Sequence, residues 1–104
     1  ARSNRTLYCA TKAAVNSLTK SMALELSPLG IRVNCLAPGL IDSGRVKTML
    51  GEDLSQRKNR VKDIPLGRLG DPEDIGATVV FLLSPENGFM TGSVVSTDGG
   101  AVAG

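Results

Sequence analysis

Residues 71–85, Asp-Pro-Glu-Asp-Ile-Gly-Ala-Thr-Val-Val-Phe-Leu-Leu-Ser-Pro, carry the signals of a helix that is buried on one side. Asp71 suits the N-cap, and Pro72 suits the first helical position, where a missing N–H is tolerated. Acidic residues in the first turn balance the positive end of the helix dipole. An apolar stripe at helical spacing comprises Ile75, Val79, Leu82 and Leu83. The sequence therefore predicts a helix that begins at Pro72 and ends at Ser84-Pro85.

Short β-branched stretches lie on both sides of this helix. Residues 31–36, Ile-Arg-Val-Asn-Cys-Leu, form a predicted strand that stops at Pro38-Gly39. Residues 93–97, Ser-Val-Val-Ser-Thr, form another. A strand, a helix and a second strand in this order are typical of a parallel crossover unit.

The predicted fold class is therefore α/β, the C-terminal part of a doubly wound parallel-sheet domain. Two strands and two main helices are present. Besides the helix that begins at Pro72, a helix is predicted over residues 7–26, near the start of the sequence. A parallel sheet needs helices on both faces, and two strands do not make a stable sheet. We therefore expect residues 1–104 to be a partial domain whose N-terminal half is absent from this sequence.

Composition excludes several classes of function. The 104 residues are 41% hydrophobic and 21% charged, a globular composition with a net charge of only +2. Only 3% of the residues are aromatic, and with so few of them a net charge of +2 does not indicate a surface that binds nucleic acid. There is no His, and Cys9 and Cys35 alone suit neither a zinc site nor a disulfide framework, so no metal is expected. No stretch resembles a membrane span or a signal peptide, and we expect a cytoplasmic protein.

The helix predicted over residues 7–26 begins with a candidate acid/base pair. Asn4 or Thr6 is expected to cap this helix. Tyr8 and Lys12 are four residues apart and therefore share one helical face. A lysine ammonium beside a phenol favours the phenolate, and such a phenol can exchange a proton with a carbonyl or alcohol oxygen. By itself the spacing also fits an ordinary surface pair, so it is only a hypothesis.

Five blocks of sequence, spread over essentially the whole chain, resemble the short-chain dehydrogenase/reductase family in that family's order. The first block, Tyr8 to Val15, is similar to the family's Tyr-x-x-x-Lys helix. The other blocks are Leu24-Glu25-Leu26, Ile31 to Asn34 with Pro38-Gly39, Pro65 to Arg68 with Asp71 to Asp74, and Thr91-Gly92 through Asp98-Gly99-Gly100. The surroundings of Tyr8 and residues 22–26 are most similar to the xylulose and carbonyl reductases. The resemblance implies that residues 1–104 are a partial NAD(P)-binding Rossmann-like domain, running from the catalytic helix to the C-terminus.

The resemblance also implies roles for individual residues. It makes Tyr8 the general acid/base, supported by Lys12, which would also bind the nicotinamide ribose. The residues implied to contact the cofactor are Tyr8, Lys12, Pro38, Gly39, Ile41 and Ser43. Gly39 would let the cofactor approach the backbone, Ile41 would offer backbone groups to the carboxamide, and Ser43 would keep the hydroxyl of the family's usual Thr.

Other parts of the matching blocks are expected to be structural. Arg32 and Asn34 are predicted to support the sheet and its loops, and Arg68 and Asp71 to form an ion pair before the later helix. Residues 42–63 are polar and mixed in charge, and they are predicted to be a mobile loop with some helix that carries substrate specificity.

The implied function is that of the C-terminal portion of an NAD(P)-dependent oxidoreductase. It would interconvert a secondary alcohol and a carbonyl of a small molecule by hydride transfer. The cofactor is NAD or NADP, with NADP favoured by resemblance, and the full-length protein would be a homo-oligomer, a dimer or a tetramer. The family's Gly-rich turn, catalytic Ser and catalytic Asn have no counterpart in these residues, so the isolated fragment is not expected to bind the cofactor well. Two alternatives stay open: a non-catalytic truncated fragment that acts through subunit packing, and a dehydration or epimerisation on the same fold.

Overall fold

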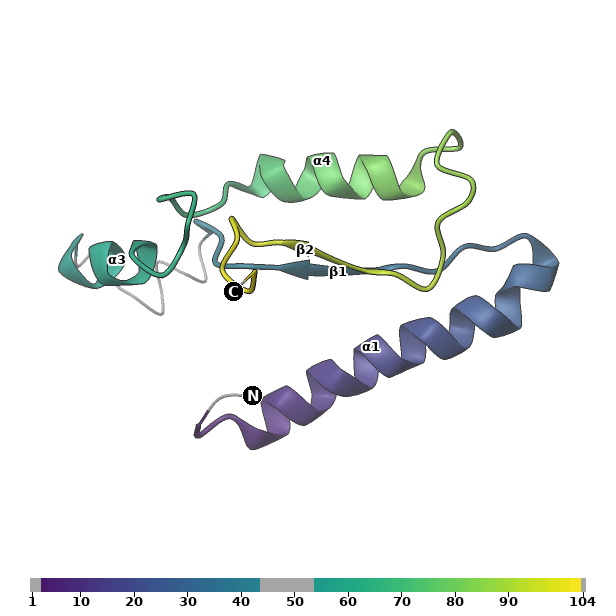
Figure 1. Cartoon of the computed structure of the whole chain (residues 1–104), viewed down its shortest axis with the longest axis horizontal. Helices are drawn as coiled ribbons and strands as arrows, with labels where there is room; N and C mark the ends of the chain where they lie inside the picture. The colour runs from purple at the N-terminus through teal and green to yellow at the C-terminus, as the bar shows by residue number, and fades with distance from the viewer. Residues whose placement is uncertain (1–2, 44–53, 104) are drawn as a thin grey trace. The chain divides into compact units, whose positions relative to one another are not determined.

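The computed structural model describes residues 3–43 and 54–103. The chain divides into two compact units, of which unit 1 comprises Ala1–Cys35 and Leu82–Val95, and unit 2 comprises Leu36–Phe81 and Ser96–Gly104. In chain order the elements are α1 (Thr6–Leu26), the short 3₁₀ helix η1 (Ser27–Leu29), β1 (Cys35–Pro38), α3 (Leu54–Val61), α4 (Pro72–Leu83) and β2 (Val94–Thr97) (Figure 1).

The two strands pair with each other in a parallel register. The Cys35 N–H donates to the Ser93 carbonyl at 2.8 Å, and the Gly39 N–H donates to the Thr97 carbonyl at 2.9 Å. Donor and acceptor are separated by the same number of residues in both bonds, as in strands that run in the same direction. Because α4 lies between β1 and β2 in the sequence, the predicted crossover unit and the α/β fold class are confirmed.

Strand β1 begins at Cys35, later than the predicted start at Ile31. In the residues just before it, side chains take the place of part of the backbone ladder. The Asn34 amide donates to the Met90 carbonyl at 3.0 Å, and its oxygen accepts the Ser93 N–H at 3.1 Å. A side chain that bonds the opposite chain in this way satisfies its polar groups without a regular strand.

Arg32 joins the end of α4 to the loop that follows it. Its guanidinium donates to the carbonyls of Leu82 at 2.9 Å, Met90 at 3.1 Å and Ser84 at 3.4 Å. Carbonyl groups at a helix C-terminus have no partner within the helix and carry partial negative charge, so a cation satisfies them well. The prediction that Arg32 and Asn34 support the loops around the sheet is confirmed.

Helix α1 begins without the predicted cap. Its N-cap residue is Arg5, and no side chain caps the first turn. The prediction of Asn4 or Thr6 as the cap is wrong because Thr6 is already helical and Asn4 lies before the cap with φ of 61°. The other end follows a common pattern of helix termination, since Gly30 adopts the left-handed conformation with φ of 73° after η1.

Helix α4 begins at Pro72, as the sequence predicts, with Glu73 and Asp74 in its first turn. Within unit 2 the helix runs along β2 (Figure 1), and the hydroxyls of Thr78 and Thr97 lie 3.1 Å apart. This polar pair is a direct contact between the helix and the strand.

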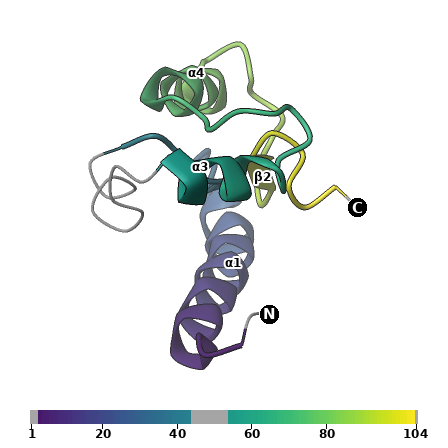
Figure 2. The same cartoon turned by 90° about the vertical axis from the view of Figure 1, so that its left-hand side faces the viewer.

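Part of the predicted loop over residues 42–63 is helix α3. Residues 44–53 lie outside the described residues, and so does the prediction made for them. After α3 the chain passes beside the C-terminal turn before it reaches α4 (Figure 2), and the Leu66 N–H donates to the Gly99 carbonyl at 3.0 Å.

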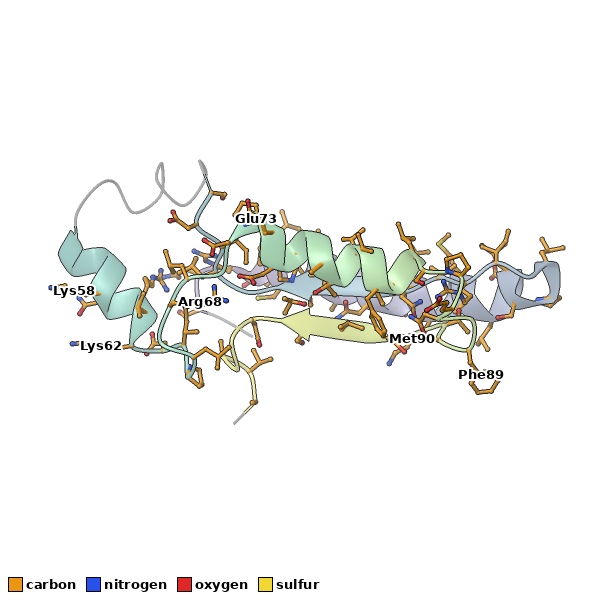
Figure 3. The ribbon with its side chains drawn as sticks, turned by 90° about the horizontal axis from the view of Figure 1, so that it is seen from above. Lys58, Lys62, Arg68, Glu73, Phe89 and Met90 are labelled. Atoms are coloured by element: carbon orange, nitrogen blue, oxygen red, sulfur yellow. The ribbon has the colours of Figure 1, made fainter. Side chains whose placement is uncertain are left out.

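The apolar side chains that the chain buries are few. Among the described residues, Ala23, Ile64 and Leu82 are the buried hydrophobic ones. Leu83, in the stripe predicted for α4, is 74% exposed, and the Phe89 side chain points away from its loop (Figure 3). The apolar stripes are therefore only partly covered by this chain. Of the helices described, none has the length and hydrophobicity that a membrane crossing requires.

Candidate functional site

Tyr8 and Lys12 lie together at the start of α1 in unit 1. Tyr8 is in the first turn, and its side chain is 48% exposed. The Lys12 Nζ lies 5.4 Å from the centroid of the Tyr8 ring, close enough for a favourable cation–π contact. The shared face that the spacing predicts is therefore present, and the phenol is open to solvent.

Arg5 is a further residue at this position that sequence reasoning missed. Its Cζ lies 5.8 Å from the centroid of the Tyr8 ring, and the first turn of α1 contains no acidic residue. The helix N-terminus adds partial positive charge to that of Arg5 and Lys12. The spacing of three residues from Arg5 to Tyr8 in the sequence indicates this contact, because residues so spaced are neighbours at a helix surface.

The other predicted site residues lie in unit 2, on the segment that follows β1. Pro38 is the last residue of β1, and the Gly39 N–H pairs with β2. The Ser43 N–H donates to the Ile41 carbonyl at 2.9 Å, which closes a tight turn. Tyr8 and Lys12 thus lie together in unit 1, whereas Pro38, Gly39, Ile41 and Ser43 belong to unit 2.

Gly39 has a function in packing that was not predicted. A methyl group added to Gly39 would lie 2.7 Å from the Cα and the Cβ of Asp98. The Asp98 carboxylate in turn accepts the N–H groups of Gly100 at 3.0 Å and Val102 at 3.1 Å. The chain therefore needs a glycine here for the approach of its own C-terminal turn, whatever else binds beside it.

The Ile41 N–H is directed away from Gly70, the residue that pairs with Ile41. It forms an isolated parallel bridge with Gly70, in which the Gly70 N–H donates to the Leu40 carbonyl at 3.0 Å and the Asp42 N–H donates to the Gly70 carbonyl at 2.7 Å. In such a bridge the polar groups of the central residue face the opposite side. The described part of the chain offers no partner to the Ile41 N–H. An amide ligand such as a nicotinamide carboxamide fits this open donor.

A cavity of about 120 Å³ lies beside Ile41. Its lining residues are Leu40, Ile41, Leu66, Arg68, Gly70, Asp74, Thr97, Asp98 and Gly99. The lining is mixed, with one guanidinium, two carboxylates and several apolar side chains. Its volume is small beside the several hundred cubic ångströms that typical ligand pockets have, so by itself it does not hold a whole dinucleotide.

Arg68, which lies just before α4 (Figure 3), has Asp74 as its main partner. It donates to the two Asp74 carboxylate oxygens at 2.9 and 3.4 Å, whereas the nearest Asp71 oxygen is 3.8 Å away. The predicted pair with Asp71 is thus the longer of two contacts. The Arg68 guanidinium and then the Asp71 N–H lower the pKa of Asp74 below its usual value, and the same pairing raises the pKa of Arg68.

The cysteines stay outside this arrangement. Cys9 and Cys35 are not joined in a disulfide, and the Cys35 Sγ lies 3.6 Å from the Asn16 Oδ1. In residues 3–43 and 54–103 the structure brings no three Cys, Asp or Glu side chains together as a metal site would require. Unit 1 thus presents a phenol with two cations, and unit 2 by itself presents the backbone amide of Ile41.

Comparisons with known proteins cover nearly the whole chain. A family model described as enoyl-(acyl carrier protein) reductase matches residues 1–102. The 2-(S)-hydroxypropyl-CoM dehydrogenase 3 of Xanthobacter autotrophicus is 43% identical over 99 residues, which cover 92% of this chain and 39% of that protein. The L-xylulose reductase of Mus musculus is 42% identical over 103 residues, covering 99% of this chain and 42% of that protein. Two relatives with different names are thus equally similar, and the predicted likeness to the xylulose reductases is not distinctive.

A solved structure gives the same result for the fold. A putative 2-deoxy-D-gluconate 3-dehydrogenase of Agrobacterium tumefaciens with bound NADP superposes with a TM-score of 0.85 at 38% identity, over 93% of this chain and 39% of that one. The chain thus spans about two fifths of the length of each of these relatives. Because the family model matches nearly every residue and the fold is shared, the chain belongs to the short-chain dehydrogenase/reductase family.

Proposed function

We propose that this chain is the C-terminal portion of an NAD(P)-dependent oxidoreductase that interconverts a secondary alcohol and a carbonyl. The observation that carries the proposal is the half-exposed Tyr8 phenol with the Lys12 ammonium 5.4 Å from its ring. Family membership supports the same reaction class, since relatives with 42–43% identity are named as a dehydrogenase and a reductase. The substrate is a small molecule with one reacting oxygen.

In this proposal Tyr8 moves the proton. Its phenol gives a proton to the substrate oxygen during reduction and takes it back during oxidation. Lys12 and Arg5, with the N-terminus of α1, place positive charge around the ring, which balances the negative charge of a phenolate. Lys12 would also donate to the ribose of the bound cofactor.

The nicotinamide cofactor supplies or accepts the hydride when it is bound. On this chain the open Ile41 N–H would bind its carboxamide, with Pro38, Gly39 and Ser43 forming the adjoining rim. We favour NADP over NAD because the similar Agrobacterium tumefaciens structure holds NADP. Residues 1–104 would then be part of an NAD(P)-binding domain whose other half holds most of the dinucleotide.

The test of this function is Tyr8→Phe in the full-length protein. We expect alcohol oxidation and carbonyl reduction to fall by roughly 10²–10⁴-fold, because the variant keeps the ring and loses the proton. NADPH binding, followed by fluorescence, is expected to persist. Thr11→Val is the matched control, since it removes a neighbouring hydroxyl that, among the described residues, bonds the Tyr8 carbonyl. Turnover by Tyr8→Phe at the wild-type rate would refute the role of Tyr8.

A second measurement tests the partial-domain proposal. The isolated 104 residues are expected to bind NADPH far more weakly than the full-length protein, because the described residues supply the rim of a site and no Gly-rich turn at a helix N-terminus. Fluorescence titration of both proteins under one buffer compares them directly. Equal affinity would show that these residues hold the dinucleotide by themselves.

A non-catalytic role through subunit packing is the second candidate, and exposed apolar side chains favour it. Leu7 is 78% exposed, Leu24 79% and Phe89 fully exposed. Such surfaces are typical of protein interfaces, and the occupant we propose is a second copy of the same protein. Light scattering after gel filtration is expected to give the molar mass of a dimer or tetramer. Phe89→Ser is expected to lower that molar mass by favouring smaller species. A monomer at all concentrations would exclude this role.

A further inference from the structure

Gly70 is hydrogen-bonded to the backbone on either side of Ile41, the residue proposed to bind the nicotinamide carboxamide. Both of its backbone groups are used, the N–H for the Leu40 carbonyl at 3.0 Å and the carbonyl for the Asp42 N–H at 2.7 Å. These two bonds lie on either side of Ile41 along the chain. The rotation of the Ile41 peptide groups is thereby set, because a backbone bonded before and after a residue has little freedom at that residue.

The position of Gly70 itself is set by the first turn of α4. The Asp71 N–H donates to the Asp74 Oδ2 at 2.8 Å, the same oxygen that accepts Arg68 at 2.9 Å. Arg68 also donates to the Leu69 carbonyl at 3.0 Å. One carboxylate therefore holds the chain on both sides of Gly70. Charge-assisted bonds of this kind are among the stronger ones in proteins.

Space at Gly70 is limited by the side chain of Ile41. A methyl group added to Gly70 would lie 2.6 Å from the Ile41 Cδ1, well inside van der Waals contact. The φ angle of Gly70 is not in the left-handed region, so an alanine there meets a neighbour and not a strained backbone. The contact between these two residues can therefore be changed by a single methyl group on either one.

We propose that Gly70 is a positioning residue, which orients the backbone of Ile41 toward the nicotinamide carboxamide and transmits the position of α4 to the cofactor. This inference rests on the proposed function, because it assigns Ile41 to the cofactor. Gly70 touches neither substrate nor cofactor, and it acts through the paired backbone of residues 40–42. The first turn of α4 thereby contributes to the affinity for the cofactor.

The experiment is a double-mutant cycle in the full-length enzyme. Gly70→Ala is expected to raise the KM and Kd for NADPH severalfold, with a smaller change in kcat, because the Ile41 side chain must shift to admit the methyl group. Ile41→Val removes the Cδ1 atom that the new methyl group would meet, so Gly70→Ala in the Ile41→Val background is expected to have little further effect. Gly76→Ala in α4 is the matched control, since a methyl group there meets nothing within 4 Å.

The outcomes separate this inference from the proposed function. Failure of the wild-type full-length protein to bind NADPH would refute the proposed function. Binding by the wild type, with Gly70→Ala leaving the Kd for NADPH unchanged or with equal effects in the two backgrounds, would overturn the role of Gly70 alone. Should Gly70→Ala fail to fold, Asp74→Asn tests the same linkage, and it is expected to raise the Kd for NADPH severalfold. An unchanged Kd in that variant would also overturn the inference.

Discussion

Gly39 and Asp98 lie so close together that a methyl group on the glycine would stand 2.7 Å from the Asp98 Cα. The neighbouring backbone is fixed as well, because the Gly39 N–H donates to the Thr97 carbonyl at 2.9 Å. The atom in the way belongs to the main chain, so it cannot turn aside as the tip of a side chain can. The end of β1 and the C-terminal turn are therefore fitted to each other.

Gly39→Ala is expected to destabilise the full-length protein by about 1–3 kcal/mol, the usual effect of forcing extra volume into a packed contact. Chemical denaturation followed by circular dichroism measures the change in the free energy of unfolding. If the glycine serves only the cofactor, the variant will lose NADPH affinity with an unchanged free energy of unfolding, which would contradict this prediction.

Gly76→Ala is expected to have the opposite effect. Gly76 lies within α4, and a methyl group there would meet no atom within 4 Å. Alanine loses less conformational freedom in a helix than glycine, so the free energy of unfolding is expected to rise by about 0.5–1 kcal/mol. The same denaturation experiment measures it, and a decrease would show that α4 has a neighbour at this position.

Arg32→Lys is expected to destabilise the protein although the charge is kept. The guanidinium reaches the carbonyls of Leu82, Ser84 and Met90 together, whereas an ammonium is a single point of charge. The expected loss is about 1–3 kcal/mol in the free energy of unfolding. The control is Arg60→Lys, the same change at an exposed residue of α3, which is expected to have little effect. Equal effects of the two changes would contradict the role of Arg32.

Asp74 is expected to give the protein a specific sensitivity to acid. Its pKa is lowered in the folded state, first by the Arg68 hydrogen bond, so its ionised form stabilises the fold above the ordinary carboxyl pKa near 4. This stabilisation is lost as the pH falls through the lowered pKa of the folded state. The side chains of both partners are partly exposed, so high salt is expected to weaken the effect.

The measurement is the denaturation midpoint of the wild type and of Asp74→Asn between about pH 6 and pH 3. The wild type is expected to lose more stability on acidification than the variant, while Glu73→Gln, in the same helical turn, keeps the wild-type slope. Parallel curves for the wild type and Asp74→Asn would show that the Arg68 pairing contributes nothing to stability.

Local signals were enough to predict the helices and the face shared by two of the site residues. The start of α4 follows from Pro72 and the acidic residues after it, which act within one turn. The proximity of Tyr8 and Lys12 follows from their spacing on α1, because the geometry of a helix brings residues four apart together. The N-cap of α1 could not be predicted in this way, since two polar residues competed and neither caps it.

Residues near each other in the chain thus determine the order of helices and strands, the parallel crossover and the Tyr8–Lys12 pair. Only the tertiary structure decides that β1 begins at Cys35, that Gly39 fits against Asp98 and that Gly70 pairs on either side of Ile41. These last features join segments far apart in sequence. Their hydrogen bonds and steric limits arise only once the strands and α4 have packed, and no spacing along the chain encodes them.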